Sequence, residues 1–259
     1  MQSDYKPILY QTNPKFDEIE VYFAHDLHYG SAEHDRKKWE AYKADILAAP
    51  NRFVVFVGDY CENAVIGSKS DIYTQTASPH YQKEWFTQQL VDLRDRTICI
   101  VPGNHEDNRI TKTCGLFPAY DCAKEAGLGD LYRHNFAFVD IGVGSSNSHQ
   151  GRQARYVGYI VHRFRDTKMY NTSDFVDGID FAAYGHDHDP KDHPRAKLVY
   201  DSKNKTVSHK NIEVIDSGAF LTYGGYGVKS AYRPTSTKCY KLILDGKRSK
   251  SMKTVGFYV

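Results

Sequence analysis

Short apolar segments that run directly into metal-binding residue types constrain this chain more than any other feature. Residues 98–101 have the composition of a buried parallel strand, and a Pro-Gly pair ends that strand with a turn. Asn104, His105 and Glu106 follow the turn directly. In open α/β sheets ligands bind at the carboxyl ends of the strands, so these three side chains are predicted to lie at a functional site.

The same arrangement recurs four more times, after the apolar segments 21–24, 53–57, 159–161 and 181–184. The polar residues that follow these segments are Asp26 and His28, then Asp59, then His162, and finally His186 and His188. Any one of them alone is more simply explained as a helix-capping aspartate or a core histidine. Nitrogen and oxygen ligands rarely gather at five strand ends by chance, so together they predict a metal site.

In chain order, these motifs resemble the signature of the calcineurin-like binuclear metallophosphoesterases, which is Asp-x-His, Gly-Asp, Gly-Asn-His-Asp/Glu, His and Gly-His-x-His. The matching stretches are Asp26-Leu27-His28, Gly58-Asp59, Gly103-Asn104-His105-Glu106, His162 and Gly185-His186-Asp187-His188. They span residues 26–188, which is most of the chain. The single histidine is assigned to His162, and not to His134 or His149, because only His162 directly follows a strong apolar strand.

The resemblance implies two divalent cations. One would be held by Asp26, His28 and His188, the other by Asn104, His162 and His186, and Asp59 would bridge the two. This mixed set of oxygen and nitrogen ligands suits Mn²⁺ first, with Fe, Zn²⁺ or Ni²⁺ as alternatives. A hydroxide between the cations would then attack the phosphate ester.

The resemblance makes His105 a proton donor to the leaving oxygen, or a hydrogen-bond donor to the phosphate, and not a metal ligand. Two nearby dications disfavour a cationic imidazole, so His105 needs a carboxylate partner, and Glu62 is the candidate. In the protein Ser/Thr phosphatase branch of the family the Gly-Asp motif continues as Gly-Asp-x-x-Asp-Arg-Gly. Here Asn63 stands in the place of the arginine, which argues against a protein phosphatase because Asn lacks the charged fork that binds phosphate.

Two other arginines are candidates for binding the phosphate. Arg109 follows His105 closely and Arg163 follows His162 directly, although each is also compatible with a solvated loop position. Asp187 is interpreted as a spacer or as a hydrogen-bond partner of a ligand histidine. His25 is interpreted as structural, because successive side chains of a strand point to opposite sides and His25 should therefore point away from Asp26.

The order of elements predicts an α/β fold. Helical patterns at 33–48, 80–94 and 119–126 alternate with strands in the first half, whereas residues 197–200, 212–216, 238–244 and 251–258 read as strands. Residues 1–18 are interpreted as an irregular lead-in, and residues 60–79 as a long insert that could shape substrate access. The pattern indicates two packed sheets with helices outside, and the resemblance implies a four-layer α/β/β/α sandwich of two mixed sheets.

Composition limits the remaining possibilities. A length of 259 residues without a linker favours a single domain spanning residues 1–259, and the net charge of +2 excludes a chain that is polyanion-binding as a whole. No apolar segment is long enough to span a membrane, and none resembles a signal peptide. Five cysteines without Cys-x-x-Cys spacing predict reduced thiols in a cytoplasmic protein.

These features predict a metal-dependent phosphoesterase, with a phosphate ester as its substrate. A phosphodiesterase acting on nucleotides or nucleic acid is favoured, because the stretch from Asp216-Ser217-Gly218-Ala219-Phe220 to Tyr232-Arg233-Pro234 resembles the C-terminal part of standalone family members encoded by bacterial viruses and mobile elements. Tyrosines that alternate with lysines and arginines between residues 223 and 250 would also suit nucleic acid. Lysine-protected edge strands would explain the same pattern more simply. The alternatives are a phosphomonoesterase or nucleotide pyrophosphohydrolase, and a non-catalytic metal-binding scaffold. The oligomeric state is left open.

Overall fold

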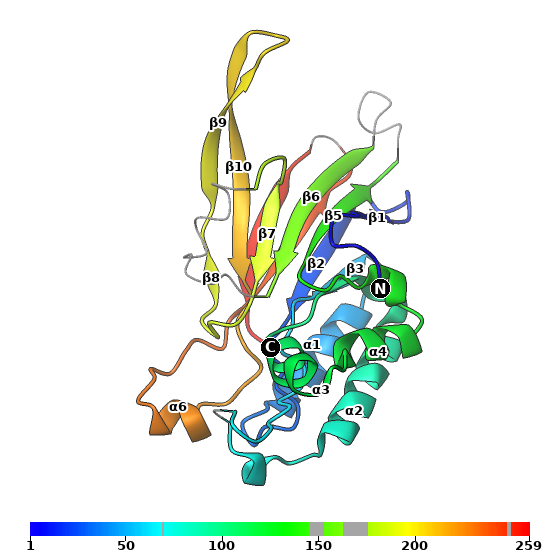
Figure 1. Ribbon diagram of the computed structural model, residues 1–259. Coiled ribbons are helices and arrows are strands. Elements are labelled where there is room, and N and C mark those ends of the chain that lie inside the picture. Colours follow the sequence, from blue (N-terminus) through cyan, green and yellow to red (C-terminus); the bar gives the residue numbers. More distant parts are fainter. Residues whose placement is uncertain (69, 146–152, 163–175, 248–249) are drawn as a thin grey trace.

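The computed structural model describes residues 1–68, 70–145, 153–162, 176–247 and 250–259, which are the parts of the chain considered from here on (Figure 1). Within them, two β-sheets pack face to face. The predicted fold class is confirmed as α/β with two mixed sheets and flanking helices.

The smaller sheet carries three of the predicted site segments. Its strand order is β12-β11-β2-β3-β4, with bounds β2 Glu18–Ala24, β3 Arg52–Phe56, β4 Thr97–Ile100, β11 Cys239–Asp245 and β12 Met252–Phe257. Strands β2, β3 and β4 run parallel to one another, whereas β11 pairs antiparallel with both of its neighbours, β2 and β12. Because parallel strands end at the same edge, the segments that follow β2, β3 and β4 are brought together there.

The larger sheet supplies the other predicted site segments. Its order is β1-β5-β6-β7-β10-β8, with β9 paired to β10. The bounds are β1 Ile8–Gln11, β5 Phe136–Val143, β6 Ala154–Val161, β7 Phe181–Tyr184, β8 Lys191–Asp192, β9 Arg195–Asp201 and β10 Thr206–Asp216. Strands β6, β7 and β10 are parallel to one another, so they also end at one edge.

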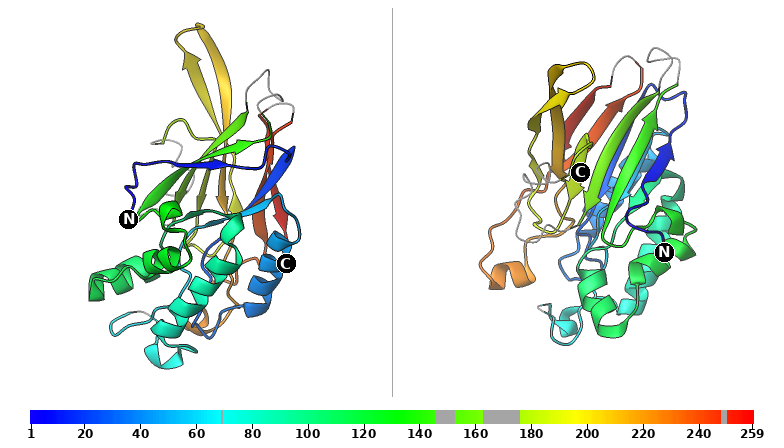
Figure 2. Two further views of the ribbon diagram at one scale, coloured as in Figure 1. Left: turned by 90° about the vertical axis from the view of Figure 1, so that its right-hand side faces the viewer. Right: turned by 45° about the horizontal axis from the view of Figure 1, so that its top comes forward.

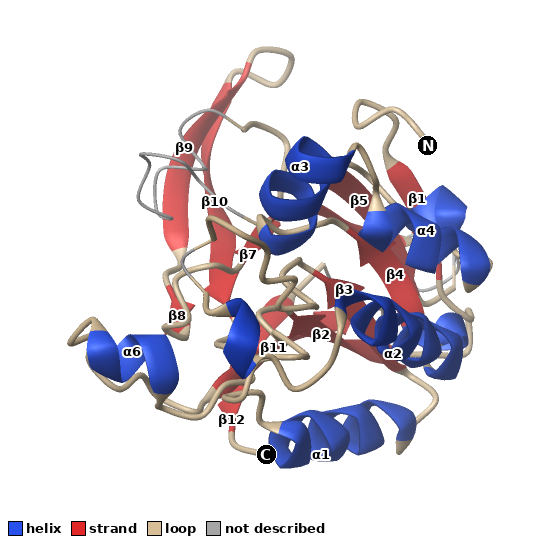
Figure 3. Ribbon diagram, turned by 60° about the horizontal axis from the view of Figure 1, so that its bottom comes forward, coloured by secondary structure: helices blue, strands red, loops and turns tan. Residues whose placement is uncertain are grey.

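Alternating side chains of the strands divide the core into layers. Residues such as Val21, Val55 and Val139 are fully buried between the two sheets. The opposite face of the smaller sheet is covered by α1 Arg36–Leu47, α2 Pro79–Asp92 and α4 Pro118–Glu125 (Figure 3). The predicted core stripe of the first helix is confirmed, because Trp39 and Tyr42 are fully buried against this sheet.

The remaining helical elements are short. They are the 3₁₀ turns Ile72–Thr74, Arg94–Arg96 and Gly129–Leu131, a π-helical segment His105–Thr111, α3 Lys112–Cys114 and α6 Gly225–Lys229. Figure 2 shows the long helices gathered at one end of the molecule, with the β9–β10 hairpin projecting at the other.

Two sequence expectations need correction. The segment 1–18 is not wholly irregular, because it contains β1, which pairs in parallel with β5. This strand has only four residues and its partner lies more than a hundred residues away, so no local pattern reveals it. Residues 206–211 also belong to β10, whose expected start was residue 212. They are mostly polar and exposed, and therefore lack the alternation that marks a half-buried strand.

All five cysteines are free, four of them buried and Cys114 exposed. This agrees with the expectation of reduced thiols. Among the described helices, none has both the length and the apolar character needed to cross a bilayer.

Candidate metal centre

The predicted ligands come from the carboxyl ends of strands in both sheets. Backbone hydrogen bonds join these ends: Asp26 N–H donates to the Gly58 carbonyl at 3.0 Å, and Gly185 N–H donates to the His162 carbonyl at 3.1 Å. Figure 3 views the molecule from below, where these strands end. His186 N–H, which follows β7 of the larger sheet, donates to Asp26 Oδ2, which follows β2 of the smaller sheet, at 2.8 Å. The two sheets therefore contribute to one shared edge.

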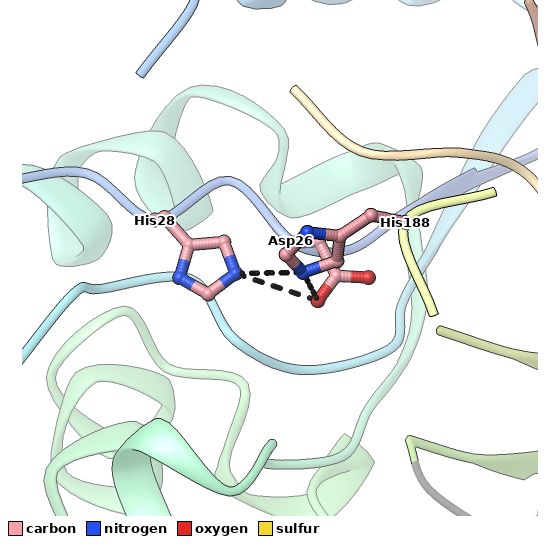
Figure 4. A group of neighbouring side chains, drawn as sticks. All are labelled: Asp26, His28 and His188. Carbon is pink, nitrogen blue, oxygen red and sulfur yellow. Dashed lines mark hydrogen bonds and ion pairs between the residues drawn. The ribbon is translucent and has the colours of Figure 1, made fainter. Parts of the chain in front are cut away.

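One group of candidate ligands consists of Asp26, His28 and His188, whose donor atoms all lie within 4.8 Å of one another (Figure 4). Asp26 Oδ1 lies 3.2 Å from His188 Nε2 and 3.6 Å from His28 Nε2. The two imidazole Nε2 atoms are 3.2 Å apart. Three donor atoms from segments far apart in the sequence thus converge on one point.

A second group consists of Asp59, His162 and His186, again within 4.8 Å. Asp59 Oδ2 lies 3.1 Å from His162 Nε2 and 4.0 Å from His28 Nε2. Asp59 also forms a third such group with His28 and His105. The Asp59 carboxylate therefore lies between the two sets of candidate ligands, where the sequence predicted a bridging residue.

Unsatisfied polar atoms test whether these residues fit a cation. Asp26 Oδ1, Asn104 Oδ1 and His162 Nε2 are buried and have no hydrogen-bond partner among the described residues. Buried polar atoms are nearly always paired, so the two unpaired oxygens among the predicted ligands suit a positive charge between them. Carboxylate, amide and imidazole donors suit Mn²⁺, Fe or Zn²⁺, and the residues present therefore fit a divalent cation.

The backbone is strained where it carries the candidate ligands. Asp26, His28, Asp59, His186 and His188 all have positive φ, between 46° and 81°. A left-handed conformation at a residue other than glycine costs on the order of 1–3 kcal/mol, and such strain clusters at functional sites. Gly103 is required for a different reason. A Cβ there would lie 2.1 Å from Asp59 Oδ1, so only glycine allows the turn after β4 to approach the loop after β3 this closely.

Hydrogen bonds behind the site orient the histidines. His162 Nδ1 donates to the Val57 carbonyl at 2.6 Å, and His28 Nδ1 donates to Glu62 Oε2 at 3.0 Å. In each case the Nε2 atom is left facing the site, as is usual for metal-binding histidines.

The charges of the site are strongly coupled. Burial disfavours a charged imidazole at His162, but the Asp59 carboxylate outweighs burial and raises the pKa of His162 to about 9. Burial also disfavours the Asp59 carboxylate, yet His105 and His162 together hold its pKa well below the usual range. The Asp59 carboxylate and the His162 imidazolium thus stabilise each other's charged forms.

His105 and Glu62 lie together, but not as a simple carboxylate–imidazole pair. His105 Nδ1 donates to the backbone carbonyl of Glu62 at 2.8 Å, and the Glu62 carboxylate is 3.7 Å from the same nitrogen. The closer contact of that carboxylate is with His28. Burial lowers the pKa of His105 to about 3, against the opposing influence of Asp59. The donor role of His105 and the partner role of Glu62 stay predictions.

The structure describes only one of the two candidate phosphate-binding arginines. Arg109 Nη1 donates to the Glu62 carbonyl at 2.7 Å and to Glu62 Oε1 at 3.0 Å, so its guanidinium is held beside His105. Arg163 falls outside the described residues. The first residues of the predicted insert, 60–63, are buried, and Glu62 among them contacts His28 and His105. The influence of residues 60–79 on substrate access stays a prediction.

Sequence reasoning missed the role of Glu106. Its carboxylate is buried and accepts four backbone N–H groups at 2.9–3.0 Å, those of Asp59, Tyr60, Cys61 and Gly103. Glu106 therefore holds the loop after β3 to the turn after β4. No sequence signal identifies these contacts, because three of the four donors are backbone atoms 45–47 residues away.

The expectation that His25 points away from Asp26 is wrong. His25 Nδ1 lies 2.6 Å from Asp26 Oδ2, and both side chains are fully buried. The positive φ of 51° at Asp26 ends the strand alternation on which the expectation depended.

Scans against protein-family models and curated proteins found no match. Solved structures do match. One is a metallophosphoesterase from Sphaerobacter thermophilus, 14% identical over 88% of this chain and 84% of that one, with a TM-score of 0.41. Another, from Streptococcus pneumoniae, is a conserved uncharacterized protein named as a predicted phosphoesterase, 11% identical over 93% of this chain and 98% of that one, with a TM-score of 0.36.

Vps29 from Chaetomium thermophilum also matches, at 9% identity over 93% of this chain and 98% of that one, with a TM-score of 0.37. The ligand distances and burial within this chain, and not these distant matches, support the function proposed below.

Proposed function

We propose that this chain is a metal-dependent phosphoesterase that uses two divalent cations. The observation that carries the proposal is the convergence of candidate ligands from four strand ends into the groups Asp26–His28–His188 and Asp59–His162–His186, with Asp59 also grouped with His28. When bound, the two cations supply a nucleophile from water at neutral pH and offset the charge that develops on the phosphoryl oxygens. The shared carboxylate suits such a pair, because two dications in proximity need an anion between them.

The proposed ligands are the members of the two groups together with Asn104, which is added from the family resemblance. Asp26, His28 and His188 would hold one cation, Asn104, His162 and His186 the other, and Asp59 would contact both. Mn²⁺ is the proposed metal, and Fe, Zn²⁺ or Ni²⁺ would suit the same donors.

His105 is the proposed proton donor. Its Nδ1 donates to the Glu62 carbonyl, so its Nε2 faces the site at 3.7 Å from Asp59 Oδ2. From there it would protonate the leaving oxygen or hydrogen-bond the phosphate. The Glu62 carboxylate would stabilise the protonated ring, and Arg109, bound to Glu62, would add positive charge towards the substrate. Arg163 is proposed for the same phosphate-facing role from its sequence position alone.

Replacing His105 with alanine is expected to lower turnover by about 10²–10⁴-fold, because general acid catalysis contributes that much. Metal content should stay near two per chain, because His105 is not a proposed ligand. Steady-state kinetics and elemental analysis of the purified variant measure the two effects. Loss of one metal together with activity would show that His105 is a ligand.

Nucleotides or nucleic acid are the proposed substrates, and a phosphodiester is the proposed bond. The segment 221–238 supports this. It starts beside the candidate ligands, since Phe220 N–H donates to the Asp26 carbonyl at 3.0 Å and Thr222 N–H donates to the Glu33 carbonyl at 2.8 Å. It contains three cations, Lys229, Arg233 and Lys238, and no acidic residue.

Aromatic side chains accompany these cations. Tyr223 is 53% and Tyr232 is 56% exposed, although such large rings are usually more buried. Exposed rings beside cations suit bases that stack and phosphates that need counter-charge. Asn63, in place of a phosphate-binding arginine, is uncharged and also buried, so it offers no positive charge to a protein phosphomonoester.

A substrate panel tests the proposal. The Mn²⁺-loaded chain should hydrolyse bis-p-nitrophenyl phosphate faster than p-nitrophenyl phosphate, and should cleave a single-stranded oligonucleotide. Preference for the monoester would favour the alternative phosphomonoesterase or pyrophosphohydrolase. Inactivity with every divalent metal would favour a non-catalytic scaffold.

Two further proposals concern the whole chain. The core between the sheets joins strands from residue 8 to residue 244, which supports a single domain over residues 1–259. The five free cysteines support a reducing compartment, and the cytoplasm is the proposed location.

A further inference from the structure

His25 lies behind the candidate metal centre and is bonded at both ring nitrogens. Ser217 N–H donates to His25 Nε2 at 3.0 Å. Because Nε2 accepts this bond, the ring proton of the neutral imidazole must be on Nδ1. His25 Nδ1–H then donates to Asp26 Oδ2 at 2.6 Å. The backbone of the loop after β10 thereby fixes the tautomer of a histidine at the end of β2.

The two oxygens of Asp26 are unequal as a result. Oδ2 accepts from His25 Nδ1 and also from the backbone N–H of His186, at 2.8 Å. Oδ1 has no hydrogen-bond partner in the described part of the chain and faces His188 and His28. Two donors therefore occupy one oxygen and leave the other as the only free acceptor for a cation.

Packing holds this arrangement in place. Asp216, the last residue of β10, lies 3.4 Å from His25 Nε2, and its Oδ1 accepts from Gly218 N–H at 2.9 Å. On the other side, a Cβ at Gly185 would lie 2.7 Å from His25 Nδ1 and 2.8 Å from Asp26 Oδ2. The imidazole is thus confined between the ends of β2, β7 and β10, which come from both sheets.

We propose that His25 is a positioning residue for metal binding, whose Nδ1–H orients the Asp26 carboxylate and raises the affinity of the Asp26–His28–His188 group for its cation. The inference rests on the proposed function, because it assumes that this group binds a metal. Hydrogen bonds to metal-binding side chains typically change metal affinity by about 10- to 100-fold. Without the His25 donor, Asp26 Oδ2 would keep only the His186 N–H, so the carboxylate would be less firmly oriented and the cation would have to order it.

Two substitutions of similar size separate positioning from packing. In His25→Asn the side-chain amide can place its N–H where Nδ1 lies, whereas in His25→Gln the longer side chain places its polar atoms near Nε2. Mn²⁺ is titrated into the metal-free chain by calorimetry. We expect His25→Gln to weaken one of the two Mn²⁺ sites by about 10- to 100-fold, and His25→Asn to keep most of the wild-type affinity.

The stability of each metal-free variant is measured by urea unfolding and serves as the control. Both variants lose ring packing, so a purely structural role would lower both stabilities and would not separate their Mn²⁺ affinities. Equal weakening in the two variants, or wild-type affinity in both, would overturn the proposal for His25. Failure of the wild-type chain to bind Mn²⁺ would instead overturn the proposed function itself.

The wild-type chain provides a second measurement that does not depend on the folding of a variant. Nitrogen NMR of the ¹⁵N-labelled chain loaded with Zn²⁺ should show His25 as a neutral imidazole with its proton on Nδ1. A proton on Nε2 would contradict the geometry on which the proposal depends.

Discussion

Replacing Asp59 with asparagine is expected to lower phosphoesterase turnover by about 10³-fold or more and to reduce metal content below two per chain. Among the described residues, Asp59 is the one candidate ligand that belongs both to the group with His28 and His105 and to the group with His162 and His186. Only 1% of its side chain is exposed, so a carboxylate from the solvent could not reach this position and take the place of Asp59. Metal ions contribute several kcal/mol to catalysis, and each 1.36 kcal/mol corresponds to a factor of ten.

Asparagine keeps the shape of the side chain. Its oxygen can still accept the backbone N–H of His105, which in the wild-type chain donates to Asp59 Oδ1 at 2.8 Å. The change therefore isolates the negative charge. His186→Asn is the matched control, because His186 belongs to one group only, and it should cost less activity and less metal than Asp59→Asn. Elemental analysis and kinetics measure both variants. A larger loss in His186→Asn would contradict the shared role of Asp59.

The candidate ligands could be identified from the sequence because their chemistry is local. An aspartate or histidine directly after an apolar segment can be recognised in a single sequence. The carboxyl ends of parallel strands then meet at one edge of the sheet. Asp26, Asp59 and His162 were found in this way, and the structure places each of them at the shared edge with its donor atoms facing inward.

The supporting residues could not be identified in this way, because their contacts depend on backbone geometry. His25 turns towards Asp26 only because Asp26 adopts a left-handed conformation, which no propensity predicts for a residue that follows a strand. Ser217, almost two hundred residues away, then contributes only its backbone N–H. Strand β1 was missed for the same reason, since its pairing with β5 is a long-range contact.

Buried side chains around the site stabilise the strained backbone of the candidate ligands. Five candidate ligands are held in left-handed backbone conformations, which persist only where the surrounding structure compensates for their cost. Much of that compensation comes from side chains that do not face a cation: the Glu62 carboxylate on His28, the His25 ring on Asp26 and the Glu106 carboxylate under the Asp59 loop. Glu106 has the most contacts of the three, and its loss should be the most damaging to the fold.

Replacing Glu106 with alanine is therefore expected to lower the free energy of unfolding of the metal-free chain by about 3 kcal/mol or more. Four backbone N–H groups now bond to its carboxylate, and alanine would leave them buried without partners. Each unsatisfied buried donor costs about 1–3 kcal/mol, partly relieved if water enters the cavity. Urea unfolding followed by circular dichroism measures the change.

Glu106→Gln and Glu84→Ala make the comparison specific. Glutamine keeps the volume but has one acceptor oxygen in place of two, and its amide N–H₂ faces backbone donors, so we expect a loss between those of alanine and wild type. Glu84 lies on α2 with a 59% exposed side chain, and its replacement should change stability by less than about 0.5 kcal/mol. If Glu106→Ala were as mild as Glu84→Ala, the four N–H groups would have to find other partners, and the Asp59 loop would not depend on Glu106 for its shape.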